Sequence, residues 1–223
     1  TTAGTNNFVL GVNAGNSIAS GGNYNVALGD EAGTAITTGD ENVCIGYQAG
    51  DAITTGTQNV AIGSNALSTE DENHYNVAIG REALQTLNGA DYNVAVGRVA
   101  GKSLTTGGQN TLVGANCGDT MTTGARNVAM GYGSLDDNVL GQRNVAIGYL
   151  ALKSCAPTAE AQGVESFNTA VGYEAGMDIT TGVHNTFIGA SAGDDVTTAN
   201  RCTVVGYNNN TSSNTTYDEI VIG

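Results

Sequence analysis

A five-residue motif, Asn-Val-Ala-Ile-Gly in its commonest form, recurs through nearly the whole 223-residue chain. The closing glycines are Gly11, Gly29, Gly46, Gly63, Gly80, Gly97, Gly114, Gly131, Gly148, Gly172, Gly189, Gly206 and Gly223. They are 17 residues apart except for one step of 18 and one of 24. A fixed period of this length means that each repeat is one structural unit stacked on its neighbours. The sequence therefore predicts a solenoid.

The pattern within each repeat predicts β-structure. Counting the Asn as position 1, positions 1 to 4 form a β-rich run that ends at the glycine of position 5, which is typical of a strand entering a turn. In the repeat of residues 42–58, a second apolar stretch at 49–53 supplies the return side before Thr54-Thr55-Gly56 turns the chain again. Two fixed glycines per repeat disfavour a helix, because each costs about 1 kcal/mol in a helix interior.

We therefore expect an all-β fold, a parallel β-solenoid (β-roll or β-helix) of about thirteen 17-residue coils. The uninterrupted period favours a single repeat domain over residues 1–223, with one insertion at 153–166. Because residue 1 is threonine and not methionine, we expect the chain to be a fragment of a longer protein.

Two positions of the repeat are nearly invariant and are predicted to be structural. Position 1 is Asn in eleven of thirteen copies, and stacked asparagines at a solenoid corner can hydrogen-bond to one another and to the turn backbone. Position 5 is Gly in every copy, as expected where a turn needs positive φ or where backbones approach closely. The predicted ladder includes Asn42, Asn59, Asn76, Asn93, Gly46, Gly63, Gly80 and Gly97.

The strand is apolar on both faces, which predicts a partner chain. Positions 2 and 4 are mostly Val, Ile and Leu, and position 3, which must point the opposite way, is Ala in seven copies and apolar in the rest. A parallel strand that is apolar on both sides needs a second layer over it, and the period leaves no residues for that layer. We therefore predict a homotrimer, intertwined or side by side. The small residue at position 3 suits a crowded trimer axis, and the reverse assignment of the two faces is the alternative.

Composition restricts the partners of this chain. Seven basic residues against 21 acidic ones give a net charge of −14, which weighs against nucleic acid, whose binding depends on Lys and Arg. No apolar run approaches the ~20 residues of a membrane helix, so we expect no membrane insertion. His74 and His184 stand alone and no CxxC motif occurs, so we expect neither a metal site nor a cofactor.

The four cysteines do not form an obvious disulfide framework. Cys44 and Cys202 lie nine repeats apart, about 43 Å at ~4.8 Å per strand, far beyond disulfide reach. A bridge between Cys117 and Cys155 requires that the irregular segment after Leu152 folds back. Otherwise all four are small buried hydrophobic residues or free thiols, as in a protein made in a reducing cytosol.

The repeat resembles a known class of fibrous proteins. The segments Asn144-Val-Ala-Ile-Gly-Tyr-Leu-Ala-Leu152 and Asn168-Thr-Ala-Val-Gly-Tyr-Glu-Ala-Gly176, the latter followed by Thr180-Thr-Gly182, resemble the shaft repeats of bacteriophage tail fibres and tail spikes. They are also similar to the head repeats of trimeric autotransporter adhesins, which build a parallel β-roll in a homotrimer. Those heads use a shorter repeat with an Ala-x-Ala-x-Gly second half, so the fibre comparison fits better.

This resemblance implies a function at a virion or cell surface. It implies a non-enzymatic, structural and adhesive segment of a trimeric virion tail fibre, or alternatively of a bacterial surface fibre. Such a segment spaces or presents a site for a host glycan or protein receptor. A secreted adhesin head and a glycan-degrading tail spike are the alternatives.

The 24-residue step is the first candidate binding site. It adds residues around Lys153, Pro157, Thr158, Glu160 and Gln162, including the only proline of the chain. Insertions in solenoids emerge as loops on one edge, where binding function concentrates. A tolerated surface loop and packing against a neighbouring chain are the alternatives.

A tyrosine strip is the second candidate. Tyr132, Tyr149 and Tyr173 follow the invariant glycine on successive repeats and are expected to stack. Aromatic rings with polar hydroxyls can bind sugar rings, although such a ladder can also simply cover the solenoid edge.

Two further functions fit the pattern less well. The repeated Thr-Thr pairs suggest an ice-binding face, but adjacent threonines point opposite ways and leave only one outward column. Polysaccharide hydrolysis needs paired carboxylates about 5 to 9.5 Å apart, and no Asp or Glu recurs at a likely cleft position. We therefore expect no enzyme activity.

Overall fold

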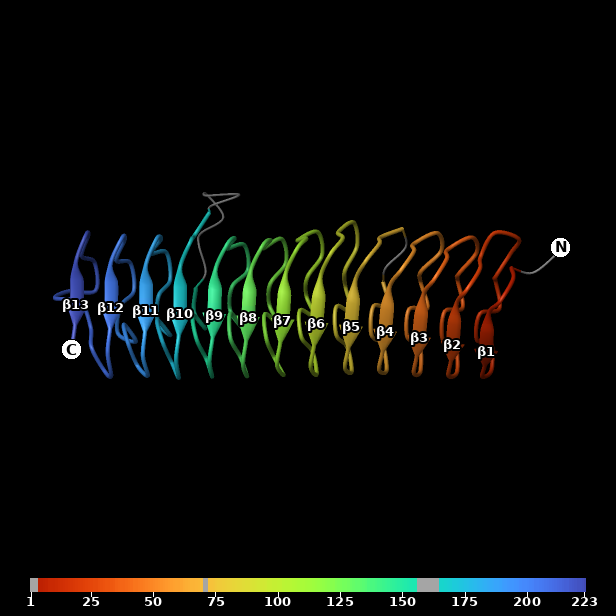
Figure 1. The fold of residues 1–223 in the computed structure, drawn as a ribbon, viewed down its shortest axis with the longest axis horizontal. Coiled ribbons are helices and arrows are strands. Elements are labelled where there is room, and N and C mark those ends of the chain that lie inside the picture. The colour runs from red at the N-terminus through yellow and green to blue at the C-terminus, as the bar shows by residue number, and fades with distance from the viewer. Residues whose placement is uncertain (1–3, 70–71, 156–164) are drawn as a thin grey trace. The chain divides into compact units, whose positions relative to one another are not determined.

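The computed structural model describes residues 4–69, 72–155 and 165–223. The chain divides into two compact units, Thr1–Gln109 and Asn110–Gly223. Within each unit, every coil contributes one three-residue strand, and the strands of successive coils pair in parallel (Figure 1). The described residues contain no helix. The predicted all-β parallel β-solenoid with a 17-residue coil is therefore confirmed.

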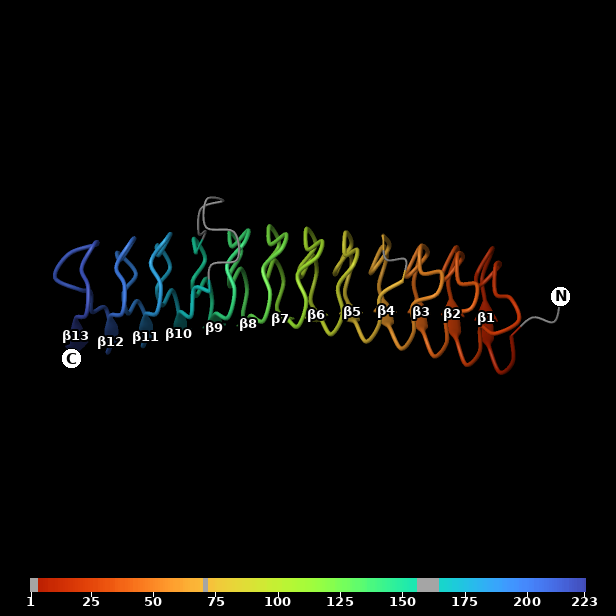
Figure 2. The same ribbon diagram turned by 90° about the horizontal axis from the view of Figure 1, so that it is seen from above.

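The strands begin at position 2 and end at position 4 of each repeat. Those of the first unit are β1 (Phe8–Leu10), β2 (Val26–Leu28), β3 (Val43–Ile45), β4 (Val60–Ile62), β5 (Val77–Ile79) and β6 (Val94–Val96). Those of the second unit are β7 (Thr111–Val113), β8 (Val128–Met130), β9 (Val145–Ile147), β10 (Thr169–Val171), β11 (Thr186–Ile188), β12 (Thr203–Val205) and β13 (Ile220–Ile222). Figure 2 shows that the strands of each unit form one row along one side of the coils.

The insertion does not disturb the register of the strands. Thr169 of β10 lies opposite Val145 of β9, so position 2 still meets position 2 across the 24-residue step. The backbone N–H of Asn168 still donates to Oδ1 of Asn144, at 3.1 Å. The described strands therefore keep the same register on both sides of the 24-residue step.

Position 3 of the strand points into the coil. Its side chains are 0% exposed in β2 to β12, namely Ala27, Cys44, Ala61, Ala78, Ala95, Leu112, Ala129, Ala146, Ala170, Phe187 and Val204. Positions 2 and 4 point outward and are intermediate or exposed. The expectation that position 3 faces a trimer axis is therefore wrong, because these side chains fill the interior of the coil and positions 2 and 4 lie on its outside.

The core is narrow because side chains from several walls of the coil converge on it. In the repeat of residues 42–58, the alanine at position 8 (Ala49) and the isoleucine at position 12 (Ile53) are both fully buried with Cys44 of position 3. Phe187 and Leu112 are the large residues at position 3, and Phe187 is the larger of the two. A Cβ added at Gly176 or Gly193 would lie 2.6 or 2.2 Å from the Phe187 ring, so the ring fits only because both flanking position-9 residues are glycine.

The asparagines of position 1 form a buried ladder of hydrogen bonds. In a typical coil, the Asn59 side-chain amide donates to the backbone carbonyl of Asn73 at 2.7 Å, and Oδ1 accepts from the backbone N–H of Asn76 at 2.9 Å. The same amide also lies 3.2 Å from Oδ1 of Asn42 in the preceding coil. Each asparagine thus satisfies a buried carbonyl in its own coil and a buried N–H in the next. In the second unit the ladder ends at Cys202, whose N–H donates to Asn185 Oδ1 at 2.9 Å.

Each coil also contains left-handed backbone positions that its neighbours stabilise. In the repeat of residues 42–58, positive φ occurs at Gly46 (130°), Gln48 (52°), Gly50 (58°) and Gln58 (58°). All four backbone N–H groups donate to carbonyls of an adjacent coil, at 2.8 to 3.0 Å. A Cβ at Gly46 would lie 2.8 Å from backbone carbon of the next coil, which explains the invariant glycine at position 5. The non-glycine residues adopt left-handed φ at a cost of about 1–2 kcal/mol each, which the hydrogen bonds between coils offset.

All four cysteines are buried and unpaired. The prediction of free thiols is confirmed, and the alternative bridge between Cys117 and Cys155 is not formed. Burial raises the pKa of the Cys44 and Cys155 thiols to about 12 and that of Cys117 to about 11. These thiols therefore stay protonated at neutral pH and serve as small core residues.

Replacing one rung of the ladder is expected to destabilise the fold strongly. Asn59→Ala removes the partners of the Asn73 carbonyl and the Asn76 N–H, and an unsatisfied buried group costs ~1–3 kcal/mol. We expect the free energy of unfolding, measured by urea denaturation with circular dichroism, to fall by about 2–4 kcal/mol. Thr55→Ala, an exposed turn residue of the preceding repeat, is the control and should change it by less than about 0.5 kcal/mol. Equal shifts for both variants would contradict the structural role of the ladder.

The thiols are expected to be unreactive until the protein unfolds. Because the thiolate is the reactive species and all four thiols are buried, Ellman's reagent at about pH 8 should label almost none of them in the folded protein. In guanidinium chloride all four should react. Rapid labelling of even one thiol in the folded protein would show that its coil opens.

Candidate interaction surfaces

The outer sheet face, defined here as the side chains of positions 2 and 4, is a partly exposed apolar surface. In the first unit every member is apolar: Phe8, Leu10, Val26, Leu28, Val43, Ile45, Val60, Ile62, Val77, Ile79, Val94 and Val96. In the second unit it includes four threonines at position 2 and well-exposed aliphatic residues at position 4, such as Met130 and Ile188 at 43%. Contiguous apolar surface of this kind marks interaction sites in soluble proteins.

The tyrosines of position 6 stack in the second unit, as predicted. The Tyr132 and Tyr149 ring centroids are 5.6 Å apart and those of Tyr149 and Tyr173 are 5.2 Å apart, with interplanar angles of 13° and 7°. All three side chains are 44–52% exposed. The rings are therefore held in fixed, nearly parallel planes at the solvent boundary.

A second aromatic column precedes the strand at position 17 of the repeat. Tyr75 and Tyr92 stack at 5.0 Å with an angle of 4°, and Phe167 stacks on His184 at 5.2 Å. The Arg143 guanidinium lies over the Phe167 ring, 5.4 Å from its centroid. The mixed stack of Arg143, Phe167 and His184 was not anticipated from the sequence, although these residues share one position of the repeat.

Most of the insertion lies outside the described residues. Of the residues predicted there, Pro157, Thr158, Glu160 and Gln162 fall outside them. Lys153 is described, and its amino group lies 3.2 Å from a carboxylate oxygen of Asp137 in the preceding coil. The binding role of this segment therefore stays a prediction.

A cluster of charged side chains surrounds Asp136. Burial, followed by the charges of Asp137 and Asp119, raises the pKa of Asp136 to about 6, and Lys153 opposes the shift. Sequence inspection missed this group, although Asp119, Asp136 and Lys153 all occupy position 10 of successive repeats. Among residues 4–69, 72–155 and 165–223, no group of three or more His, Cys, Asp or Glu side chains is placed to hold a metal ion.

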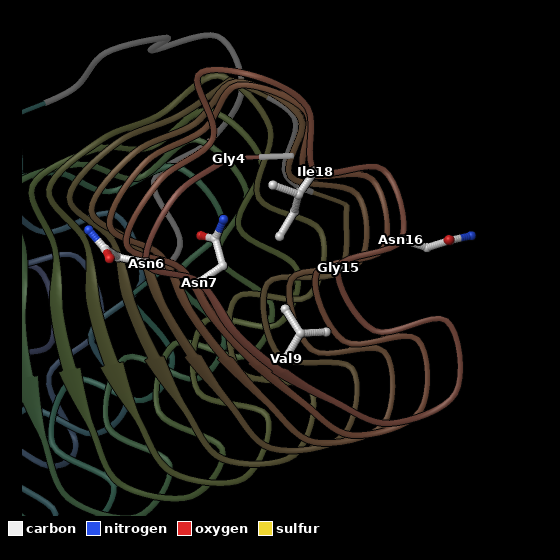
Figure 3. Close-up of a pocket in the computed structure, with 7 residues that line it drawn as sticks. All are labelled: Gly4, Asn6, Asn7, Val9, Gly15, Asn16 and Ile18. Atoms are coloured by element: carbon white, nitrogen blue, oxygen red, sulfur yellow. The ribbon is translucent and has the colours of Figure 1, made fainter. Parts of the chain in front are cut away.

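A hollow of about 480 Å³ lies at the first coil of the first unit. Val9 and Ile18 point into it and Asn16 points away (Figure 3). Val9 and Ile18 occupy positions 3 and 12 of their repeat, which form the core in the following coils, for example as Ala27 and Ile36. The hollow is thus the interior of the first coil seen end-on, with Val9 40% exposed because no described coil covers it.

Comparisons with protein-family models, with curated proteins and with solved structures find no match to this chain. In the part of the chain that the structure describes, no helix is long and apolar enough to cross a membrane. The functional argument therefore depends on the surfaces described above.

The elevated pKa of Asp136 predicts a specific pH dependence of stability. Because this pKa is raised to about 6, the folded state holds a proton that the unfolded state has lost. Stability should therefore fall as pH rises from about 4, near the pKa of the unfolded state, to about 6, and Asp136→Asn should remove that part of the fall. At about pH 7.5 we expect the variant to be about 1 kcal/mol more stable in urea denaturation, allowing for solvent screening of this half-exposed group.

The control for this prediction is Asp178→Asn, an aspartate on another coil of the same unit. It should leave the fall in stability near pH 6 unchanged. A wild-type profile that matches the Asp136→Asn profile from about pH 5 to pH 8 would contradict the assignment.

Proposed function

We propose that this chain is a structural and adhesive segment of a homotrimeric fibre, a bacteriophage tail fibre or a bacterial surface fibre, which spaces or presents a host receptor-binding site. The outer sheet face is the observation that carries the proposal. In the first unit, two adjacent columns of apolar side chains run along all six strands without a polar member. A surface of this regularity is well suited to a partner that repeats with the same spacing.

A second copy of the chain is the partner that fits best. Neighbouring parallel strands lie ~4.8 Å apart, so the outer sheet face offers a Val or Ile pair at that interval. Another copy in parallel orientation has the same interval, and cyclic symmetry gives every coil an equivalent environment. The resemblance to tail-fibre shafts supports three chains rather than two.

The proposed contact between chains uses the opposite face of the strand from the one that we expected from the alternation of side chains in the sequence. The alanines of position 3 fill the interior of the coil, so they do not contribute to a contact between chains. The β-branched side chains of positions 2 and 4 would form that contact instead. Burying such side chains stabilises by up to about 1.5–3 kcal/mol each when exposure is lost completely, and these half-exposed ones would contribute less.

The proposal predicts the mass of the protein in solution. At micromolar concentration, sedimentation velocity or native mass spectrometry should show a trimer. The double variant Ile147→Glu with Ile188→Glu places charges on the outer sheet face and should sediment as a monomer with an unchanged circular dichroism spectrum. Both isoleucines are already 37–43% exposed in the single chain, so the coil itself should tolerate the change.

The matched control places the same charges on a different side of the same unit. Thr123→Glu with Thr181→Glu alters two exposed turn residues and should remain trimeric. A monomeric wild-type protein would overturn the proposal.

A further inference from the structure

The tyrosine column of the second unit is interrupted at one coil. Position 6 is Tyr at Tyr132, Tyr149 and Tyr173, then Ala190, and then Tyr again at Tyr207. The strand register carries this column through the interruption, since Val171 pairs with Ile188 and Ile188 with Val205. The backbone after the strand is equally regular, because Ser191 N–H donates to the Tyr173 carbonyl at 2.8 Å and Asn208 N–H to the Ala190 carbonyl at 2.9 Å.

The interruption leaves Tyr173 and Tyr207 without an aromatic residue at position 6 of the coil between them. Tyr149 has a tyrosine on each side and is 44% exposed, whereas Tyr173 is 52% and Tyr207 78% exposed. Tyr149 stacks on Tyr173, and no ring stacks on the opposite face of Tyr173 within residues 165–223. Because Ala190 has only a methyl group, its side chain is far shorter than the tyrosine side chains of the coils on either side.

We propose that Tyr173, Ala190 and Tyr207 form a slot that binds a neutral pyranose ring of an oligosaccharide. Tyr173 and Tyr207 would be its walls and Ala190 its floor. The ring faces of tyrosine carry negative electrostatic potential, which attracts the polarised C–H groups on the faces of a sugar ring. This inference deepens the proposed function by naming the class of receptor, and it rests on the adhesive part of that proposal but not on the trimer.

The width of the slot favours a sugar over a flat aromatic ring. Two coils separate Tyr173 from Tyr207, which places their backbones ~9.6 Å apart. Carbon atoms in contact are ~3.5–4.0 Å apart. A flat ring that contacts both walls therefore needs the walls to be only about 7–8 Å apart, which is less than the separation here. A pyranose chair is thicker, because the ring is puckered and carries hydrogens on both faces, so it can contact both walls at once.

Polar residues adjoin the slot. Glu174, Ser191 and Asn208 follow the three slot residues directly and share a left-handed φ of 51–54°, so they form a parallel polar column. Their carboxylate, hydroxyl and amide groups suit the hydroxyls of a sugar. The neighbouring Glu174 carboxylate raises the pKa of the Tyr173 hydroxyl, so this hydroxyl stays protonated and able to donate at neutral pH. The net charge of −14 disfavours acidic sugars, so a neutral hexose or N-acetylhexosamine is the favoured ligand.

The decisive variant fills the slot with the residue that the chain uses elsewhere in the column. Ala190→Tyr should stack between Tyr173 and Tyr207 and occupy the space of the sugar, with the fold kept because the other tyrosines of position 6 follow the same glycine. Ala115→Tyr is the matched control, since it adds a tyrosine at position 6 next to Tyr132 and leaves the slot open. Tyr207→Ala removes one wall.

The experiment begins with a glycan array of neutral and acidic oligosaccharides probed with the wild-type protein. The best neutral oligosaccharide is then titrated against each variant, with tyrosine fluorescence as the signal, because the chain has no tryptophan. We expect at least a tenfold loss of affinity for Ala190→Tyr and for Tyr207→Ala, and no change for Ala115→Tyr. Circular dichroism and sedimentation of each variant verify the fold and the number of chains.

Three results would overturn the slot. The first is no binding to any neutral glycan on the array, and the second is unchanged binding by Ala190→Tyr. The third is tighter binding of the aromatic compound p-cresol than of the sugar in the same titration. That result would assign the space to an aromatic ligand. Sedimentation separates this failure from failure of the fibre proposal, because a trimer that binds no sugar refutes only the slot.

Discussion

Hydrogen bonds between successive coils, all made in one register, are the interaction on which the rest of each unit depends. A three-residue strand has too few backbone groups to be stable alone, and each coil gains its stability from its neighbours. The asparagine column extends this pairing to the corner of the coil, where Asn59 connects its own turn to the next coil through two buried hydrogen bonds. The same pairing holds the left-handed residues, such as Gln48 and Gln58, in conformations that would be unfavourable in isolation.

The fixed register also explains what the fold tolerates. Extra residues between Cys155 and Ser166 are accepted because Asn168 still reaches Asn144 and β10 still pairs with β9 position for position. A larger core residue is accepted only where a neighbour is smaller, as Phe187 is between Gly176 and Gly193. A change in repeat length is therefore compatible with the stack where the strand register is kept. A change in core side-chain size is compatible where a neighbouring core residue is smaller.

This architecture turns repeat positions into surface columns, and the candidate functions lie in those columns. The outer sheet face comes from two positions that are apolar in nearly every copy, and such uniformity suits a contact with another copy of the chain. The slot comes from a departure from the repeat, where one alanine at Ala190 replaces a tyrosine between Tyr173 and Tyr207. Uniform columns thus suit assembly, and interruptions in a column suit recognition of a small group.

The period, the strand positions, the invariant glycine, the asparagine ladder and the stacking of Tyr132, Tyr149 and Tyr173 were all predictable from the sequence. Each depends on one residue type recurring at one position, and a stack of equal coils places equal positions in contact. The raised pKa of Asp136 was not predictable in this way, because its first cause is burial, which the repeat pattern does not reveal. The stack of Phe167 on His184 was not predictable either, because it joins two different ring types. The sequence alone also determined that positions 2 and 4 lie on the opposite face from position 3, since side chains alternate along a strand. Only the tertiary structure decided which face is inside, because that depends on the distance between the walls of the coil. The interior that Ala49 and Ile53 leave is narrow, so the small residue of position 3 points inward and the larger Val and Ile side chains remain on the surface.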